Sequence, residues 1–250
     1  MPRELLQAPA PRVAPLLLGT FLVSGEGTGR VVVRVDEVEA YAGVGEDPGS
    51  HAHRGPRPRN ATMFARPGAL YAYFTYGMHW CLNVVAHPVG VGEPSADASE
   101  ARAPEGGAAE GGAAGPAGAV LLRAGEVVEG VALARSRRTA ARRDVDLARG
   151  PARLAVALGL TGEQDGADLL DPVGPVQLLA GPAPVEVSVG PRVGVAGDGA
   201  TTPWRWWDAR SAHVSDYRAA QPRARRSGPQ APGRSGPRST DSTSPAGGVP

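Results

Sequence analysis

Positions 29–40 read GRVVVRVDEVEA, and within this segment Val31, Val33 and Val35 alternate with other residues. A period of two is typical of a β-strand, because successive side chains of a strand point to opposite faces. We therefore expect a strand over Thr28–Glu39. This strand carries Glu39, the acidic residue that we consider for catalysis.

Two further motifs follow the strand. Positions 50–64 read SHAHRGPRPRNATMF, which is basic, and positions 68–85 read GALYAYFTYGMHWCLNVV, which is aromatic-rich and carries no Asp, Glu or Arg. The basic motif belongs to a long loop over Tyr41–Asn60, and loops of that length in a compact domain are usually functional or disordered. The aromatic motif predicts a β-hairpin over Gly68–Val85 with its turn near Thr75–Gly77.

The rest of the chain alternates between short helices and strands. Pro151 at the start and Gly159 just past the end of GPARLAVAL predict a helix over Gly150–Leu158. An apolar stripe predicts a longer helix over Glu126–Arg143. The other elements expected are a helix at Arg3–Gln7, a segment entering Leu16–Val23, and strands at Ala119–Ala124, Val176–Leu179, Val185–Val189 and Arg192–Val195.

Composition separates an ordered body from two segments of low complexity. Residues 90–118 are a Gly/Ala/Glu run with almost no large apolar residue, and such a segment cannot bury enough surface to fold. Residues 218–250 are rich in Pro, Ser and Arg. We expect one domain over residues 1–217 with a flexible insertion at 90–118, followed by a disordered basic tail at 218–250.

Several functional classes are disfavoured by the residues that the chain lacks. Cys81 is the one cysteine of the 250 residues, so neither an intrachain disulfide nor an all-cysteine metal site can form. The longest apolar run near the start, 16–23, is interrupted by Gly19 and Thr20 and is too short to span a membrane. These features favour a soluble cytoplasmic protein.

Every one of the 26 basic residues is arginine. Without lysine, no side-chain amine can form a Schiff base, which excludes lyase chemistry through lysine. The net charge of +1 conceals two basic blocks: residues 51–66 hold four arginines and no acid, and residues 123–153 hold eight arginines against four acids. Local positive surface of this kind is suited to contact phosphate.

Glu39 is the acid that we expect to act as a catalytic base. Its neighbours Val38 and Ala40 are apolar, and burial would raise its pKa toward the range of a useful base. A solvated carboxylate is the alternative.

Four of the five tyrosines fall within residues 41–76. A turn that bears an aromatic residue and a methionine could wedge into a base stack. Core packing would also explain the aromatic residues.

His51 and His53 form an H-x-H pair, but no third ligand of matching spacing accompanies them, so we expect no metal site. Arg54, Arg57 and Arg59 in the same loop are better interpreted as phosphate contacts, with a solvated loop as the alternative. One acid, phosphate-binding arginines and stacking rings are what an enzyme needs when it acts on a base extruded from a nucleic-acid duplex.

The set of motifs resembles the alkyladenine (3-methyladenine) DNA glycosylase family of the alkylpurine-excising type. The resemblance runs from about Arg3 to about Tyr217, apart from the insertion. The motifs that carry it, in order, are VEAYAG, SHAHRG, RNATMF, PGALYAYFTYGMHWCLNVV, AVLLRA, ARGPARLAVALGL, RVGV and PWRWW. It implies a mixed α/β (α+β) single domain, with a curved, largely antiparallel sheet surrounded by helices and without metal or organic cofactor.

The resemblance also implies roles for individual residues. Glu39 would activate water against the sugar C1′, and Arg123 would help to hold that water and the nucleotide backbone. The base would be contacted by Tyr41, His51, Tyr73 and Asn83, the last of which would disfavour guanine. Tyr76 would insert into the duplex with Met78 beside it. The loop between Gly43 and His51 is about one residue longer than the commoner pattern, so His53 is the alternative to His51.

Together these inferences predict a monofunctional glycosylase that flips out alkylated or deaminated purines in double-stranded DNA, excises them hydrolytically and leaves an abasic site. We expect a monomer that is associated with the nucleoid and not with a membrane. Two other hypotheses compete with this one. A non-catalytic module of the same fold would bind damaged DNA without releasing a base, and a nucleoside hydrolase would act without DNA.

Overall fold

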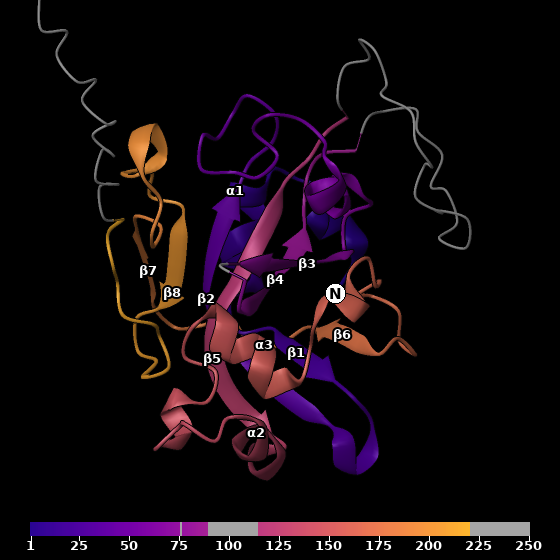
Figure 1. Ribbon diagram of the computed structural model, residues 1–250, viewed down its shortest axis with the longest axis vertical. Helices are drawn as coiled ribbons and strands as arrows, with labels where there is room; N and C mark the ends of the chain where they lie inside the picture. The colour runs from indigo at the N-terminus through magenta and orange to yellow at the C-terminus, as the bar shows by residue number, and fades with distance from the viewer. Residues whose placement is uncertain (76, 90–114, 221–250) are drawn as a thin grey trace, which may run out of the picture.

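The computed structural model describes residues 1–75, 77–89 and 115–220, and its central feature is one antiparallel sheet. Hydrogen-bonded neighbours follow the order β3-β4-β5-β2-β1-β6, and β8 pairs with both β2 and β7. In Figure 1, β2 and β5 run through the middle of the molecule, with β7 and β8 on one side and β6 on the other. The strands are β1 (Phe21–Ser24), β2 (Val31–Tyr41), β3 (Leu70–Thr75), β4 (His79–Val85), β5 (Ala119–Glu129), β6 (Val176–Leu179), β7 (Val187–Gly190) and β8 (Arg205–Asp208).

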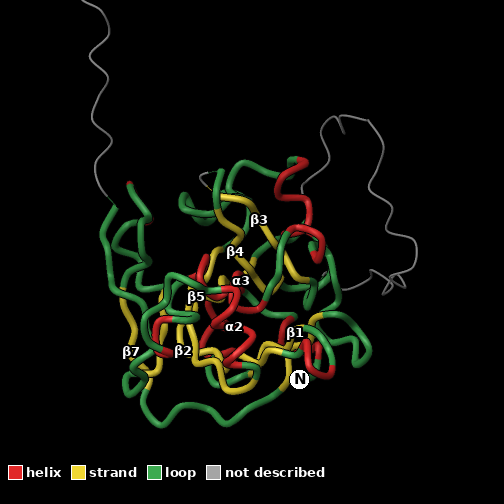
Figure 2. Tube along the Cα trace, turned by 60° about the horizontal axis from the view of Figure 1, so that its bottom comes forward, coloured by secondary structure: helices red, strands yellow, loops and turns green. Residues whose placement is uncertain are grey.

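Helices are short, and loops make up much of the chain outside the sheet (Figure 2). The α-helices are α1 (Ala10–Val13), α2 (Val131–Arg137) and α3 (Pro151–Leu158). Single turns of 3₁₀ helix lie at η1 (Arg3–Leu6), η2 (Ala14–Leu17), η3 (Gly27–Gly29), η5 (Asp144–Asp146), η6 (Gly162–Gln164) and η7 (Gly197–Gly199), and a longer one is η4 (Pro58–Phe64). The predicted fold class, a mixed α/β domain with a curved, largely antiparallel sheet, is confirmed.

A β-bulge in β2 decides which side chains face the core. Val31, Val33 and Val35 belong to the core cluster, but further along the strand the core residues are Val38 and Ala40. The pairing of β2 with β5 shifts register between Val35 and Val38, and a bulge of this kind moves subsequent side chains to the other face. Glu39 therefore lies on the face opposite the core, and not on the face of the three valines.

The side chains of the hairpin strands β3 and β4 also alternate between the core face and the opposite face of the sheet, here without a bulge. Leu70 and Ala72 of β3 and Leu82 and Val84 of β4 belong to the core cluster. Their odd-numbered neighbours point to the opposite face, because the period of a strand is two. The predicted hairpin is confirmed, with Met78 N–H donating to the Thr75 carbonyl across the turn at 3.1 Å.

The helix predicted over Gly150–Leu158 is confirmed as α3, with Pro151 in its first turn and Gly159 at φ +69° just beyond its end. The helix predicted over Glu126–Arg143 is wrong in its first part, because β5 continues to Glu129 against β2 and only Val131–Arg137 is α-helical. Pairing with a long central strand here outweighs the apolar stripe.

The strand predicted at Arg192–Val195 is also wrong, since that segment is a loop. The strands formed nearby are β7 and β8, and β8 comes from the PWRWW motif, for which no strand was expected. Tyr76, most of the insertion (90–114) and most of the tail (221–250) lie outside the described residues.

Candidate active site

A cavity of about 540 Å³ opens on the face of the sheet opposite the core cluster. This volume falls within the range of about 300–1,000 Å³ that is typical of small-molecule sites. Its walls come from β3, β4 and β5, from the loop after β2, from the start of α3 and from the loop after Arg192. The lining residues include Tyr41, Pro48, His51, Met63, Tyr71, Tyr73, Cys81, Asn83, Leu121, Arg123, Pro151, Ala152, Val193 and Val195.

The sheet register brings residues of four strands into one row. Glu39 of β2 is opposite Leu121 of β5, Leu121 is opposite Asn83 of β4, and Asn83 is opposite Tyr71 of β3. Side chains at the same level of neighbouring strands lie on the same face and within contact distance of one another. The antiparallel pairing thus places the acid, the amide and the aromatic ring in one row, with Leu121 between Glu39 and Asn83, although they are far apart in sequence.

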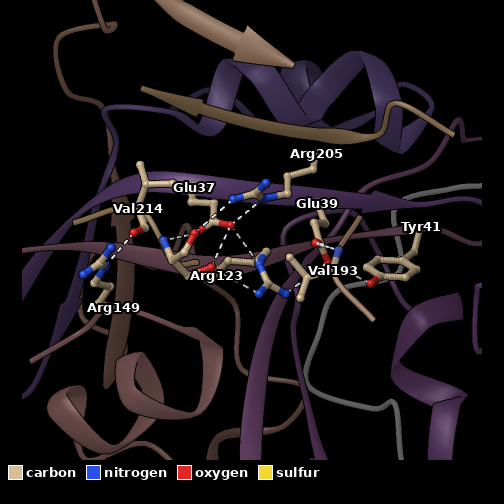
Figure 3. A network of polar contacts seen from close by, with 9 residues as sticks. Glu37, Glu39, Tyr41, Arg123, Arg149, Val193, Arg205 and Val214 are labelled. Atoms are coloured by element: carbon tan, nitrogen blue, oxygen red, sulfur yellow. Dashed lines mark hydrogen bonds and ion pairs between the residues drawn. The ribbon is translucent and has the colours of Figure 1, made fainter. Parts of the chain in front are cut away.

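Glu39 is fully buried, and its carboxylate accepts three hydrogen bonds from residues that line the cavity (Figure 3). The Val193 N–H donates to Oε1 at 2.6 Å, and Oε2 accepts from the Tyr41 hydroxyl at 2.9 Å and from Arg123 Nη1 at 3.3 Å. Burial raises the pKa of Glu39, and the charge of Arg123 opposes part of this shift. The carboxylate therefore lies directly behind the cavity wall, with a basicity above that of an ordinary glutamate.

A second buried carboxylate, Glu37, lies on the same strand. Arg123 Nε and Arg205 Nε donate to its Oε1 at 3.0 and 2.6 Å. Ser215 adds its hydroxyl on Oε1 at 2.9 Å and its N–H on Oε2 at 2.7 Å. With these donors in place, Glu37 serves to orient Arg123, whose other end reaches Glu39 (Figure 3).

Glu37 and Arg205 were not predicted as parts of the site. The one sequence signal for Glu37 is its spacing of two residues from Glu39, since residues two apart share a face of a strand. The available signal for Arg205 is its place in the PWRWW motif. The expectation of one isolated carboxylate is therefore incomplete: Glu37 is buried two residues from Glu39 on the same strand, and Arg123 and Arg205 neutralise its charge.

A second ion pair joins the loop before His51 to the loop that carries Val193. Arg192 and Asp47 are both buried and form a bidentate pair with N···O distances of 2.5 and 2.8 Å. Arg192 also donates to the Ala40 carbonyl at 2.9 Å, and its guanidinium lies 4.7 Å from the centre of the Tyr41 ring. Sequence analysis missed both residues; the RVGV motif was the available signal for the arginine.

One wall of the cavity is aromatic. The rings of His51 and Tyr73 meet edge to face at 4.7 Å, and those of Tyr71 and Tyr73 stack at 5.6 Å between centres. His51 Nδ1 lies 3.0 Å from the Tyr71 hydroxyl, and burial lowers the pKa of His51, which favours the neutral imidazole. The structure places His51, and not His53, on the cavity.

Asn83 completes the group at the cavity floor, where its Nδ2 donates to the Tyr71 carbonyl at 2.9 Å. This bond holds the Asn83 amide in one orientation at the cavity wall. The predicted residues that the structure brings together are therefore Glu39, Arg123, Tyr41, His51, Tyr73 and Asn83.

The other predicted residues that the structure describes do not line the cavity. Met78 is 68% exposed at the hairpin tip, beside the undescribed Tyr76. Arg54, Arg57 and Arg59 are exposed on the loop after His51. Asn60 holds that loop close to the cavity, because its Nδ2 donates to the His51 carbonyl at 2.7 Å. These residues can therefore meet a large ligand at the rim but cannot touch one inside.

Within residues 1–75, 77–89 and 115–220, no group of three or more His, Cys, Asp or Glu side chains is arranged to hold a metal ion. In the same ranges no helix has both the length and the apolarity needed to cross a bilayer.

Comparison with known proteins gives the geometry a context. A family model described as methylpurine-DNA glycosylase (MPG) matches residues 4–95 and 110–212. A protein of Streptomyces avermitilis is 47% identical over 227 residues, which are 90% of this chain and 94% of that protein. A protein of Leifsonia xyli is 49% identical over 222 residues, covering 86% and 92%, and one of Nocardia farcinica is 44% identical over 227 residues, covering 88% and 92%.

All three relatives carry the name "Putative 3-methyladenine DNA glycosylase". The family model and these relatives cover nearly the whole of the described structure, including the strands that build the cavity. The chain belongs to the methylpurine-DNA glycosylase family of N-glycosylic hydrolases.

Proposed function

We propose that this protein is a monofunctional DNA glycosylase that extrudes an alkylated or deaminated purine, 3-methyladenine being the model case, from double-stranded DNA and hydrolyses its N-glycosidic bond. The observation that carries the proposal is the buried Glu39 carboxylate, bound by three cavity residues and raised in pKa by burial. A cavity of this size with an aromatic wall suits a purine ring, which stacks on aromatic side chains.

In this mechanism the extruded purine lies between Tyr41 on one side and the His51–Tyr73 pair on the other. A water molecule enters from the cavity between Tyr41 and Arg123 and reaches Glu39. Its oxygen bonds to C1′ as the C1′–N bond breaks, its proton passes to the carboxylate, and the bonding electrons leave with the purine. Arg123 keeps the Glu39 carboxylate in position through its hydrogen bond to Oε2.

The charge of the leaving purine determines whether it must be protonated as the C1′–N bond breaks. A purine alkylated at N3 or N7 is cationic, so it accepts the bonding electrons and departs neutral. A neutral lesion such as hypoxanthine must gain a proton as it leaves, which demands an acid from the site or solvent. The reaction should therefore be faster with cationic lesions.

The absence of lysine supports a reaction that stops at the abasic site, because no side-chain amine can attack C1′ and open the route to strand cleavage. We further propose that Arg54, Arg57 and Arg59 contact DNA phosphates, that Tyr76 and Met78 enter the duplex, and that the enzyme acts as a monomer on nucleoid DNA in the cytoplasm. The exposure of Met78 and of the three arginines at the rim supports these roles.

Product analysis on a defined duplex tests the proposal. Wild-type protein is incubated with a duplex carrying one methylated purine, and both the free base and the DNA strand are quantified. We expect free purine together with an intact strand that breaks only on later alkali treatment. Tight binding without base release would instead identify a binding module, and release from the free nucleoside at an equal rate would identify a nucleoside hydrolase.

A further inference from the structure

A second hollow, of about 560 Å³, lies between the segment after α2 and the start of α3. Its lining holds four arginines, Arg138, Arg142, Arg143 and Arg153, and one acid, Asp146. We call this set the α2–α3 basic pocket. It shares no lining residue with the candidate active site.

The positive charge of this pocket is largely uncompensated. Asp146 binds Arg143 through N···O contacts of 2.9 and 3.2 Å. In the part of the chain that the structure describes, no carboxylate forms an ion pair with Arg138, Arg142 or Arg153. An anion placed among these guanidinium groups would be attracted by several like charges at once.

One of these arginines is held in place by the backbone. Arg138 Nε donates to the Leu147 carbonyl at 3.0 Å, which leaves its terminal nitrogens for a ligand. Burial and the nearby positive charge of Arg153 lower the pKa of Arg138. Two guanidinium groups held near each other against their repulsion gain stability from an anion that lies between them.

The pocket adjoins the active-site cavity through one turn of helix. Pro151 and Ala152 line the cavity, and Arg153, the next residue of α3, lines the basic pocket. In Figure 1 the loop that follows β2, which leads to Arg54, Arg57 and Arg59, lies at the top, whereas α2 lies at the bottom and α3 between them. Arginines therefore adjoin the cavity at two places: on the loop after His51 and at the start of α3.

We propose that the α2–α3 basic pocket binds a backbone phosphate of the duplex whose extruded base occupies the cavity. This inference rests on the proposed function, because it assumes that the base arrives as part of DNA. A duplex that delivers a base into the cavity must pass over its mouth, and each of its strands carries one phosphate per about 3.4 Å of helix axis. Contacts with both groups of arginines would fix the position of the strand relative to Glu39.

The test is an Arg142→Ser/Arg153→Ser protein, because both residues are exposed and neither contacts the cavity. Binding to a duplex with one abasic analogue is measured at several salt concentrations. We expect the Kd to rise about tenfold and the slope of log K against log salt to become shallower by about one unit. The single-turnover rate of base release at saturating protein should stay at the wild-type value, because the pocket acts on binding alone.

Two controls separate this effect from loss of net charge. Arg12→Ser/Arg210→Ser removes the same charge from exposed positions elsewhere and should leave the Kd within about twofold of wild type, as expected for screened surface charges. Arg142→Lys/Arg153→Lys keeps the charge and should restore most of the affinity. Equal Kd and salt slope for the pocket variant and the Arg12/Arg210 variant would overturn the proposal.

Inorganic phosphate, at constant ionic strength, distinguishes a DNA contact from a free-anion site. Weaker phosphate binding by the pocket variant with unchanged DNA binding would also overturn the proposal. The two proposals fail separately: if the wild type releases no purine, the proposed function fails, whereas the binding data still decide whether the pocket contacts DNA.

Discussion

Arg123 connects the buried carboxylates of Glu37 and Glu39 on β2, and its Nε and Nη1 atoms reach different acids. Two carboxylates two residues apart would repel each other in a site of low dielectric constant, and the arginine between them removes that penalty. Because Glu37 also accepts hydrogen bonds from Arg205 and Ser215, Glu39 is the carboxylate that is available to accept a proton from water. Chemistry at this site is therefore assigned to Glu39 alone, although Glu37 is buried two residues away.

Sequence reasoning could reach Glu39, Arg123 and the aromatic residues because they occur in contiguous motifs. It could not reach Asp47 and Arg192, which are 145 residues apart and owe their importance to each other. The role of either residue becomes clear only when the position of its partner in the folded structure is known. Pairings of this kind are set by tertiary contacts that no local pattern records.

The Asp47–Arg192 pair gives a prediction at the residue scale. Asp47→Asn leaves Arg192 as an unpaired buried charge, so the free energy of unfolding should fall by about 3 kcal/mol. Single-turnover base release should slow by about 10- to 100-fold, since Val193 and Tyr41 lose the contact that fixes them beside Glu39. Loss of the Val193 donor should also shift the pH dependence of the rate upward.

Denaturant titrations and single-turnover assays measure these effects. The matched control is Asp168→Asn, which breaks ion pairs with Arg3 and Arg66 that are more exposed and do not line the cavity. It should cost less stability and leave the rate unchanged. If Asp47→Asn slows the reaction no more than the control does, the pair is structural alone.

At the scale of elements, the alternation of residues in β2 predicts the strand but not the face on which Glu39 lies. Alternating valines correctly predict the strand, and if the alternation continued unbroken, Glu39 would share the face of Val35. The bulge between Val35 and Val38 reverses this, so the acid faces the cavity. A bulge depends on how two strands pair, which is why the alternation alone cannot reveal it.

Gly125 of β5 lies opposite this irregular region and gives the prediction for the element. A Cβ at this position would be 2.0 Å from the Arg34 carbonyl oxygen and 2.8 Å from the Val33 side chain. Gly125→Ala should therefore force the strands apart, lower the free energy of unfolding by about 3 kcal/mol and reduce base release, since Arg123 is two residues away.

The control is Gly29→Ala, where an added Cβ would meet nothing within 4 Å. Thermal and denaturant unfolding of the two variants should differ clearly. Wild-type stability and activity in Gly125→Ala would show that the pairing of β2 with β5 does not need this close approach.

At the scale of the whole molecule, the residues that the structure describes suffice to build the cavity. Val85 at the end of β4 pairs with Ala119 at the start of β5, so the residues between them connect neighbouring ends of two strands. The predicted insertion (90–118) falls mainly on residues outside those described, and the sequence predicts that it contributes no core.

Replacing residues 90–114 with a short Gly-Ser linker therefore should leave base release at the wild-type rate. The free energy of unfolding should change by at most about 1 kcal/mol, because loop-closure entropy depends only on the logarithm of loop length. Melting curves and single-turnover assays on the shortened protein measure both. A protein that unfolds without cooperativity, or folds but releases no base, would show that this segment belongs to the working molecule.

The proposed mechanism requires Glu39 to act as the base that activates water. The direct measurement is the single-turnover rate of purine release from a methylated duplex, across pH, for wild type and Glu39→Gln, with the exposed Glu46→Gln as control. Because burial raises the pKa of Glu39 and a base acts when unprotonated, the wild-type rate should rise with pH through a value above the usual glutamate range near 4.3. Glu39→Gln should lose at least about 100-fold in rate together with this pH dependence. A Glu39→Gln protein that releases purine at the wild-type rate would contradict the account.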